Sequence, residues 1–302
     1  MGNLQSTPPP ASRPAVVRFA EDMVCRFRDD DVQALGAQLT YYLILAFFPF
    51  LIFLLNLIGY MQLSSEQFMA ELIRLLPEES GKAVDDIIAE VTRGSSRTLL
   101  SFGMIATLWA ASNGINAVIK ALNKAYDEEE NRPFWKVRGV SLLSTFVLAF
   151  VILIAMLLLV FGRPIGQYLF EQLGYPAGFE ALWSLLKAAL PLSAMFGVFM
   201  LLYRLTPNRR LRWREVIPGS CFATVGWIAT SLLFSYYVNH FGNYEATYGS
   251  VGGIIVLLIW LYISSLIILF GGELNASLTF LREGKIKPTK RPFHFRWPRF
   301  LQ

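Results

Sequence analysis

The side chains best suited to chemistry in this sequence are polar groups embedded in long apolar stretches. Hydrocarbon offers such groups no hydrogen-bonding partner, so each of them marks either a functional site or a contact between helices. The candidates to line or gate a substrate path are Tyr41, Tyr42, Asn113, Asn116, Lys187 and Glu273. Together they would supply hydrogen bonding and charge recognition for a solute, and Glu273 would also suit a proton-coupled mechanism.

Two asparagines of this set share one helical stripe. Asn113, Asn116 and Lys120 stand at i, i+3 and i+7, so a helix places them on the same face. The stripe either lines a hydrophilic cavity or forms hydrogen bonds between helices, each worth about 0.6–2 kcal/mol. Both readings stay open on the sequence alone.

The two charged candidates also have two readings each. Lys187 either snorkels to the outer headgroups or faces the helix bundle, where an anionic ligand or acidic partner is its natural counter-charge. Glu273 follows two glycines near the inner interface. It is either a functional acid or one half of a structural ion pair with Arg204 or with the arginines of 209–214.

Five further residues are candidates for gates or hinges. Pro49 and Pro191 interrupt helical hydrogen bonding inside apolar stretches, which is tolerated where neighbours or water satisfy the freed carbonyl. His240 is either an outer-face proton or ligand site or a histidine in an interfacial turn. Gly249 and Gly253 have the GxxxG spacing that permits close helix contact.

The elements that must position these side chains are six stretches without Asp, Glu, Lys or Arg. They are 32–65, 98–119, 139–162, 188–203, 216–244 and 246–272. A helix needs about 20 apolar residues to cross roughly 30 Å of hydrocarbon. A chain that is 54% hydrophobic and 16% charged has too little polar surface to bury all six in a soluble core. The sequence therefore predicts an all-α, polytopic membrane protein.

The predicted organisation has three parts: a flexible leader at 1–15, a membrane domain at 16–283 and a basic tail at 284–302. The six spans are expected at about 36–62, 98–119, 139–162, 183–203, 216–238 and 249–273. Val17, Ala20, Val24 and Phe27 recur at helical spacing, which predicts an amphipathic helix on the membrane surface before the first span. A second amphipathic element, a helical hairpin across 65–94, is expected on the outer side.

Basic residues predict the orientation. Twenty-one of the 27 Lys and Arg residues lie at the two ends of the chain and in alternate connections, against five in the other connections, with Lys187 inside a span. The positive-inside rule places both termini in the cytoplasm, and anionic headgroups are the expected partners of these basic collars. The tail, which mixes arginines with aromatic residues, suits interfacial anchoring better than RNA binding. A nucleic-acid partner is therefore not expected.

Motifs for common enzyme chemistry are missing from the sequence. Metal-assisted RNA cleavage needs clustered His, Asp or Glu ligands, whereas the two histidines, His240 and His294, lie far apart on opposite sides of the predicted membrane. The sequence also contains no Walker motif, dinucleotide-binding loop or nucleophile elbow. Neither a metal, a cofactor nor an enzymatic activity is predicted.

Three segments resemble a known family. They are AQLTYYLILAFFP at 37–49, WAASNGIN with ALNKAY within 109–126, and the run at 202–276 that includes LYRLTPNRRLRWREVIPG and GGELNA. They resemble the YihY/BrkB family of bacterial inner-membrane proteins, some of whose members were labelled ribonuclease BN. The resemblance covers roughly 16–283 and implies six transmembrane helices in the bacterial cytoplasmic membrane. It does not imply a settled activity.

The sequence favours a transporter or exporter of a small solute or lipid-like amphiphile. Six helices would enclose a polar cavity lined by the first, second, fourth and sixth spans. The alternative is a non-transporting membrane scaffold that organises envelope or lipid-handling partners through its surface helices and basic tail. A homo-oligomer is compatible with either hypothesis.

Overall fold

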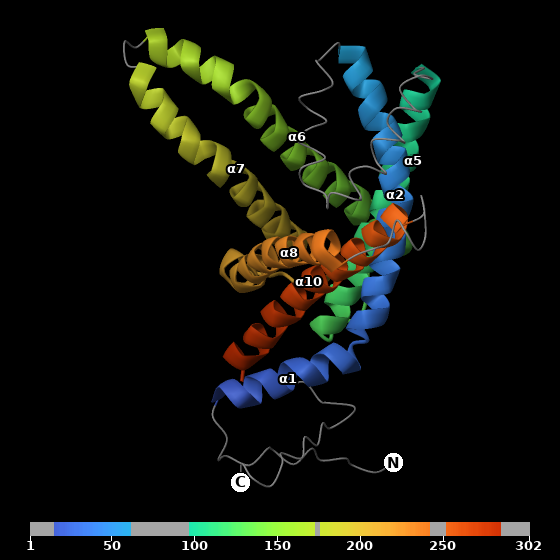
Figure 1. Cartoon of the computed structure of the whole chain (residues 1–302). Helices are drawn as coiled ribbons and strands as arrows, with labels where there is room; N and C mark the ends of the chain where they lie inside the picture. The colour runs from blue at the N-terminus through green and yellow to red at the C-terminus, as the bar shows by residue number, and fades with distance from the viewer. Residues whose placement is uncertain (1–14, 62–96, 173–175, 242–251, 285–302) are drawn as a thin grey trace, which may run out of the picture.

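Seven helices make up the residues that the computed structural model describes, which are 15–61, 97–172, 176–241 and 252–284 (Figure 1). The helices are α1 (Ala15–Asp29), α2 (Val32–Met61), α5 (Arg97–Ala125), α6 (Phe134–Gln172), α7 (Pro176–Leu205), α8 (Trp213–Phe241) and α10 (Gly252–Arg282). These ranges contain no strand, and the predicted all-α class is confirmed.

Six of the seven helices are long and apolar enough to cross a membrane. The apolar windows are Val32–Ile52, Ser101–Ala125, Phe134–Ala155, Leu182–Leu205, Trp213–Val238 and Gly252–Arg282. Each window lies in the helix that contains one of the six predicted spans. α6 continues ten residues beyond the charge-free stretch that ends at 162. The predicted leader, tail and outer hairpin lie outside the described residues, apart from Ala15 and Gly284.

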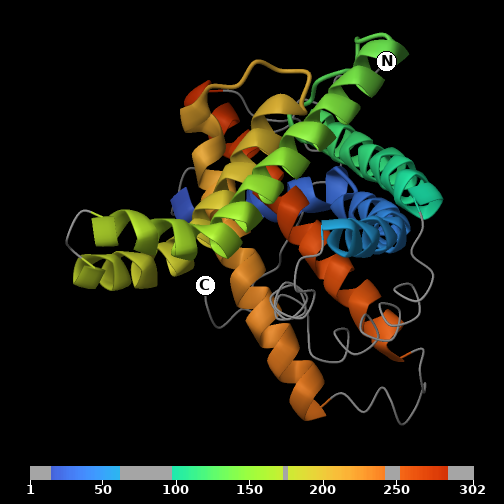
Figure 2. The same cartoon turned by 90° about the horizontal axis from the view of Figure 1, so that it is seen from above.

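Two pairs of helices separate at one end of the molecule and are joined by direct contact between α5 and α6 and through α8 and α10. α2 packs along α5, and α6 packs along α7. In Figure 1 these pairs lean apart toward the top of the view. α10 contacts α8, α2 and α5, while α8 also contacts α7. Figure 2 shows α8 extending away from the α6–α7 pair. α10 therefore contacts helices from both halves of the sequence, α1, α2 and α5 as well as α8.

The opposite end carries α1, the α5–α6 and α7–α8 connections and the end of α10, and we call it the basic end. α1 lies across this end against α10 and α2. It buries Met23 and Arg26 toward the protein and leaves Val24 exposed. Part of the predicted apolar stripe of α1 therefore faces outward. Asp31, with a φ of 51°, allows the sharp turn from α1 into α2.

Buried side chains form two clusters. The larger one fills the basic end, where Leu122 of α5, Tyr203 of α7, Val216 of α8 and Ala276 of α10 belong to the same cluster. The smaller one joins the far part of α8 to the start of α10 around Val238 and Val256. Val32 and Leu39 of α2 also belong to the larger cluster, so the basic end is the place where five of the long helices share a core.

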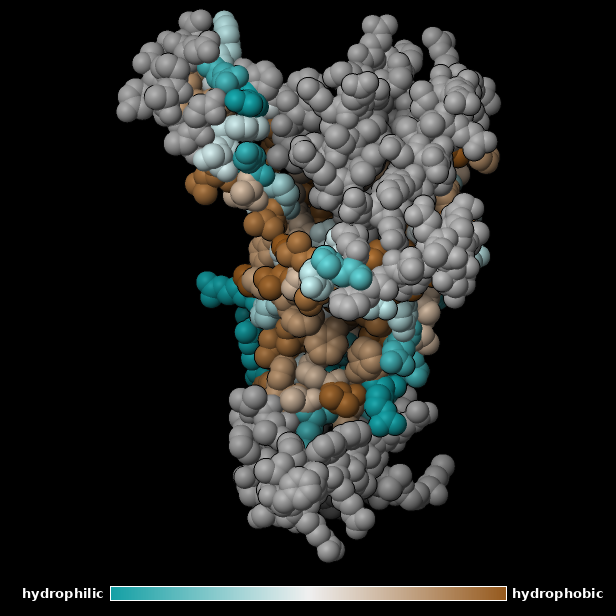
Figure 3. Space-filling view, in the orientation of Figure 1, coloured by the Kyte–Doolittle hydropathy of each residue, from teal (hydrophilic) through white to brown (hydrophobic). Residues whose placement is uncertain are grey.

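The remaining surface is apolar over the middle of the molecule, as the brown side chains in Figure 3 show. Phe102, Ile105, Leu143 and Leu233 are among the large exposed apolar side chains. Contiguous exposed apolar surface of this kind marks contact with lipid or another protein. Many large apolar side chains are therefore exposed on the protein surface instead of being buried in its core.

Candidate functional site

Glycines at the basic end bring three helices into contact with α10. A Cβ atom on Gly271 would lie 2.9 Å from the carbonyl oxygen of Gly219 and would also overlap the hydroxyl of Tyr203. A Cβ atom on Gly272 would overlap the side chain of Leu122. The hydroxyl of Tyr203 donates to the carbonyl of Ile268 at 2.7 Å. Two consecutive glycines therefore let α10 approach α8, α7 and α5 in one turn.

The next turn of α10 places an asparagine against an interrupted part of α8. Pro218 lies inside α8 and has no N–H to donate. The neighbouring N–H of Gly219 donates to Oδ1 of Asn275 at 2.6 Å, and Nδ2 of Asn275 donates to the carbonyl of Val216 at 3.3 Å. Asn275 is fully buried. Its amide thus satisfies the α8 backbone beside the proline.

Glu273 lies in this junction, between the paired glycines and Asn275. The residue is only 2% exposed, and it lies within electrostatic range of Tyr126 at the end of α5. A carboxyl group buried this deeply requires polar or charged neighbours, because an isolated buried charge is costly. Glu273, a path candidate from the sequence, is therefore a buried residue at the junction of α10 with α5, α7 and α8.

The α5–α6 and α7–α8 connections hold one another at the basic end. Asn123 donates to Glu130 at 2.8 Å and accepts the backbone N–H of Asn208 at 2.7 Å. Arg132 donates to both carboxylate oxygens of Glu130, at 2.7 and 2.6 Å, and to the carbonyl of Thr206 at 3.2 Å. The hydrogen bonds from Arg132 lower the pKa of the Glu130 carboxyl group.

Arg209 extends this set of contacts to the end of α10. It pairs with Glu128 at 3.5 Å and with Glu283, and it lies over the rings of Tyr126 and Phe280. Three segments distant in the sequence are thereby joined: the α5–α6 connection, the α7–α8 connection and the last turn of the described chain. We call these contacts of Asn123, Glu128, Glu130, Arg132, Asn208, Arg209 and Glu283 the basic-end clasp.

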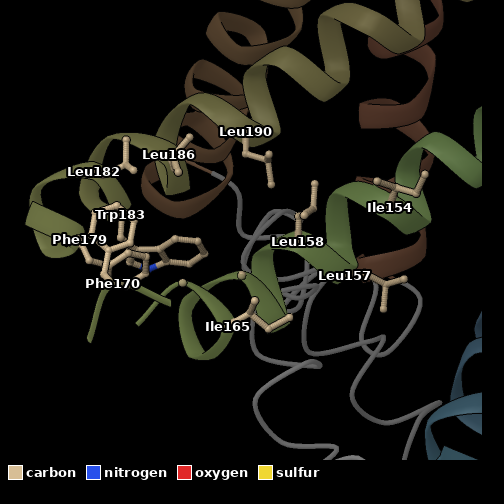
Figure 4. Close-up of a pocket in the computed structure, with 12 residues that line it drawn as sticks. Ile154, Leu157, Leu158, Ile165, Phe170, Phe179, Leu182, Trp183, Leu186 and Leu190 are labelled. Carbon is tan, nitrogen blue, oxygen red and sulfur yellow. The ribbon is translucent and has the colours of Figure 1, made fainter. Parts of the chain in front are cut away.

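An apolar pocket of about 610 Å³ lies between α6 and α7 (Figure 4). Its lining residues are Ile154, Leu157, Leu158, Gly162, Ile165, Gly166, Phe170, Phe179, Leu182, Trp183, Leu186 and Leu190. Several of these side chains, such as Ile165 and Leu182, are more than a third exposed, so the pocket opens to the surroundings. Every lining side chain is apolar apart from the indole N–H of Trp183.

Aromatic rings close the pocket near the α6–α7 turn. The ring of Phe179 is 5.4 Å from Phe170 and stacks at 5.9 Å on Trp183. A Cβ atom on Gly162 would lie 2.9 Å from the Trp183 ring, and one on Gly166 would overlap Phe179. Gly162 and Gly166 have GxxxG spacing, which is the sequence signal that would have predicted this close contact.

The six sequence-predicted path residues lie in different surroundings, and none of them lines this pocket. Tyr41 is 58% exposed, while Tyr42, whose ring is 5.4 Å away, packs against the core. Asn113 accepts a hydrogen bond from Arg138 at 2.6 Å, and Asn116 is half-buried in α5. Lys187 is exposed on α7, one residue beyond Leu186 of the pocket lining. A path shared by all six stays a prediction.

The five gate or hinge candidates are also dispersed. Pro49 is half-buried within α2, and Pro191 is exposed within α7. His240 stacks on Tyr236 at 4.1 Å, and its Nδ1 lies 3.0 Å from the Tyr236 carbonyl. Gly253 is half-buried at the start of α10, whereas Gly249 lies outside the described residues. The role proposed for the Gly249–Gly253 pair therefore remains a prediction.

The six apolar helices and the lipid-suited surface define a multi-pass integral membrane protein. Residues 23–293 match the family described as virulence factor BrkB, and the chain belongs to this family. The predicted resemblance is confirmed. Within the described ranges, no group of three or more His, Cys, Asp or Glu side chains is placed to hold a metal ion.

Relatives of this chain have names that describe either a membrane protein or a ribonuclease-like protein. The ribonuclease-like protein YfkH of Bacillus subtilis (strain 168) is 42% identical over 276 residues, which cover 91% of this chain and 99% of YfkH. UPF0761 membrane proteins of Chromohalobacter salexigens and Pseudomonas aeruginosa (strain LESB58) are each 29% identical. These matches cover 87% of this chain and 63% of each of the two relatives. No solved structure matches the chain.

Proposed function

We propose that this protein is a transporter that moves a lipid-like amphiphile across the bacterial cytoplasmic membrane. The observation that supports the proposal is the apolar pocket between α6 and α7. A hydrophilic solute would lose its hydration there without gaining hydrogen bonds, which is unfavourable. The acyl chain of an amphiphile pays no such penalty, because it makes no hydrogen bonds that the pocket would have to replace. The pocket volume is also within the range of ligand sites, about 300–1,000 Å³.

The position of the pocket along α6 supports an exporter rather than an ordinary lipid contact. On the orientation that the basic residues predict, the basic end is cytoplasmic and the pocket lies in the outer half. Its lining extends along α6 from Ile154 to Phe170, about 24 Å at 1.5 Å per residue. Arg163, where the charge-free stretch ends, lies between those residues. The pocket therefore reaches beyond the predicted outer boundary of the hydrocarbon, where an amphiphile would leave the membrane.

Reconstitution of the full chain tests the proposal. In proteoliposomes that contain a fluorescent phospholipid, the protein should increase the rate at which the probe moves between leaflets. Leu158→Trp, which fills the pocket, should lower that rate about ten-fold, equivalent to about 1.4 kcal/mol. Leu143→Trp is the matched control, since Leu143 is an exposed residue of α6 outside the pocket. Movement at the rate of protein-free vesicles would refute the proposal, as would equal rates in the two variants.

A membrane scaffold is the rival function, and the dense packing of the basic-end clasp favours it. A scaffold needs a rigid surface rather than a path for a substrate. The scaffold hypothesis predicts that the lipid probe moves between leaflets no faster than in protein-free vesicles. In cells, it predicts envelope defects when residues 1–34 or 283–302 are removed, with no defect for Leu158→Trp.

A further inference from the structure

We propose that Arg204 and Trp213 form a binding site for the anionic headgroup of a cytoplasmic-leaflet phospholipid, and that one face of α7 connects this site to the α6–α7 pocket. The inference rests on the proposed transport of an amphiphile and adds the charge of its headgroup and the place where it is loaded. Four observations carry it: the geometry of Arg204, the state of the neighbouring arginines, the open position of Gly197 and the periodicity of α7.

Arg204 is held in an arrangement that suits anion binding. Its guanidinium carbon lies 3.8 Å from the centre of the Trp213 ring, and Trp213 is 47% exposed. Nη1 of Arg204 is buried and has no hydrogen-bond partner among the described residues. Stacking on an aromatic ring fixes the plane of a guanidinium group, and a fixed guanidinium binds phosphate or carboxylate through parallel hydrogen bonds.

The arginines that follow in the sequence fall into two groups. Arg209 is neutralised within the basic-end clasp by Glu128 and Glu283. Arg210, Arg212 and Arg214 are exposed and make no ion pair with a described residue. The carboxylate of Glu215 accepts the backbone N–H of Arg212 at 2.7 Å. The structure thus leaves uncompensated positive charge on the segment that includes Trp213, which attracts anionic lipids.

The face of α7 that lines the pocket continues to Arg204. Gly197, Leu201 and Arg204 lie 7, 11 and 14 residues beyond the pocket residue Leu190. At 3.6 residues per turn these spacings return close to the same face. A Cβ atom added to Gly197 would meet nothing within 4 Å, so this part of the face is open. From Trp183 to Arg204 the face is about 31 Å long, close to the thickness of the hydrocarbon core.

Lipid binding by the intact protein tests the site. The full chain in detergent is titrated with phosphatidylglycerol or with phosphatidylcholine of the same acyl chains, and bound lipid is counted by native mass spectrometry. We expect phosphatidylglycerol to be preferred, and Arg204→Gln to weaken its binding about ten-fold, as loss of a charge-assisted contact does. Trp213→Leu should weaken binding while keeping every positive charge, and Arg204→Lys should restore part of it. Arg282→Gln is the matched control, because Arg282 is an exposed arginine of the basic end outside the proposed site, and it should leave binding within about two-fold of wild type.

Several results would overturn the inference. One is equal weakening by Arg204→Gln and Arg282→Gln, which indicates a diffuse basic collar. Equal binding of the two lipids is another, and so is binding of inorganic phosphate without retention of lipid. If Arg204→Gln melts at a lower temperature than wild type, Arg204→Lys, which retains the charge, takes its place in the comparison of lipid binding. Selective lipid binding without movement in vesicles would refute the proposed transport but keep this site. If Arg204→Gln changes neither lipid movement nor lipid binding, the proposed headgroup site is refuted and the proposed transport is kept.

Discussion

A single amide side chain, that of Asn275, connects the two most irregular features of the basic end. It reaches from α10 to the backbone of α8 beside Pro218, where the N–H of Gly219 has turned toward it. Buried backbone groups without partners cost free energy comparable to a lost hydrogen bond. The sequence run around Pro218 is therefore stable only with a polar residue at position 275.

Replacement of Asn275 by leucine should lower the stability of the protein. The N–H of Gly219 would be left buried without an acceptor, which costs about 1–3 kcal/mol. Thermal unfolding of the purified protein in detergent measures the change. Asn131→Leu is the control, because Asn131 is exposed in the α5–α6 connection. Equal melting temperatures for wild type and Asn275→Leu would show that water or a rearranged backbone satisfies this N–H.

At this scale the sequence identifies polar residues but not their surroundings. Tyr41 and Tyr42 are adjacent and equally polar, yet one is exposed and the other packs against the core. Successive residues of a helix point about 100° apart, and the rotation of the helix against its neighbours decides which one is buried. Asn113 gives the same lesson, because its partner Arg138 is 25 residues away on another helix.

The close approach of α8 and α10 depends on backbone space rather than on side-chain attraction. A Cβ atom on Gly219 would overlap the Gly271 carbonyl, which is backbone and cannot move aside as a side chain can. Small residues at such crossings permit the van der Waals contact that joins helices in lipid. The crossing therefore fixes how α8 and α10 pack and, through them, the position of the basic-end clasp.

Gly219→Ala should separate α8 from α10 and lower stability by about 1–3 kcal/mol, as overpacking does in protein cores. Gly139→Ala is a matched control within α6, since nothing lies within 4 Å of its Cβ position. The control should be neutral or more stable by up to about 1 kcal/mol, because alanine favours the helix. Thermal unfolding of both variants distinguishes the two cases. A Gly219→Ala protein as stable as Gly139→Ala would mean that the helices can part at no cost.

Helix lengths show what the sequence could and could not predict about elements. Charge-free stretches predicted six spans because charged residues are rare inside the hydrocarbon and reappear at its boundary. A helix has no need to end there, and α6 continues beyond Arg163 to Gln172. The pocket residues Ile165 and Phe170 lie on this extension, so a prediction made from span boundaries did not include them.

Over the whole molecule, the gathering of basic residues at one end gives the fold a direction. The clasp, α1 and the end of α10 lie at that end, and the end of α6 and the start of α7 lie at the other. The positive-inside rule assigns this end to the cytoplasmic side of the membrane in our proposal. The proposed loading site at Arg204 and the exit pocket depend on this direction.

Cysteine labelling tests the orientation in a background without Cys25 and Cys221. A membrane-impermeant maleimide should label Tyr168→Cys in intact spheroplasts, because Tyr168 is exposed on the part of α6 predicted to lie outside. It should label Arg210→Cys only after the membrane is permeabilised. The opposite pattern would place the basic end outside and would reverse the proposed direction of transport.

The basic-end clasp also bears on how the chain is synthesised. Asn123 meets Asn208 across 85 residues, and Arg209 meets Glu283 across 74. A ribosome delivers these partners one after another, so a nascent chain that stalls before the final helix would display unmatched amide and guanidinium groups to the cytosol. In cells, incompletely folded chains are continuously triaged by chaperones and proteases. We therefore expect products truncated before α10 to be degraded faster than the untruncated chain carrying a point substitution at the lipid-facing surface.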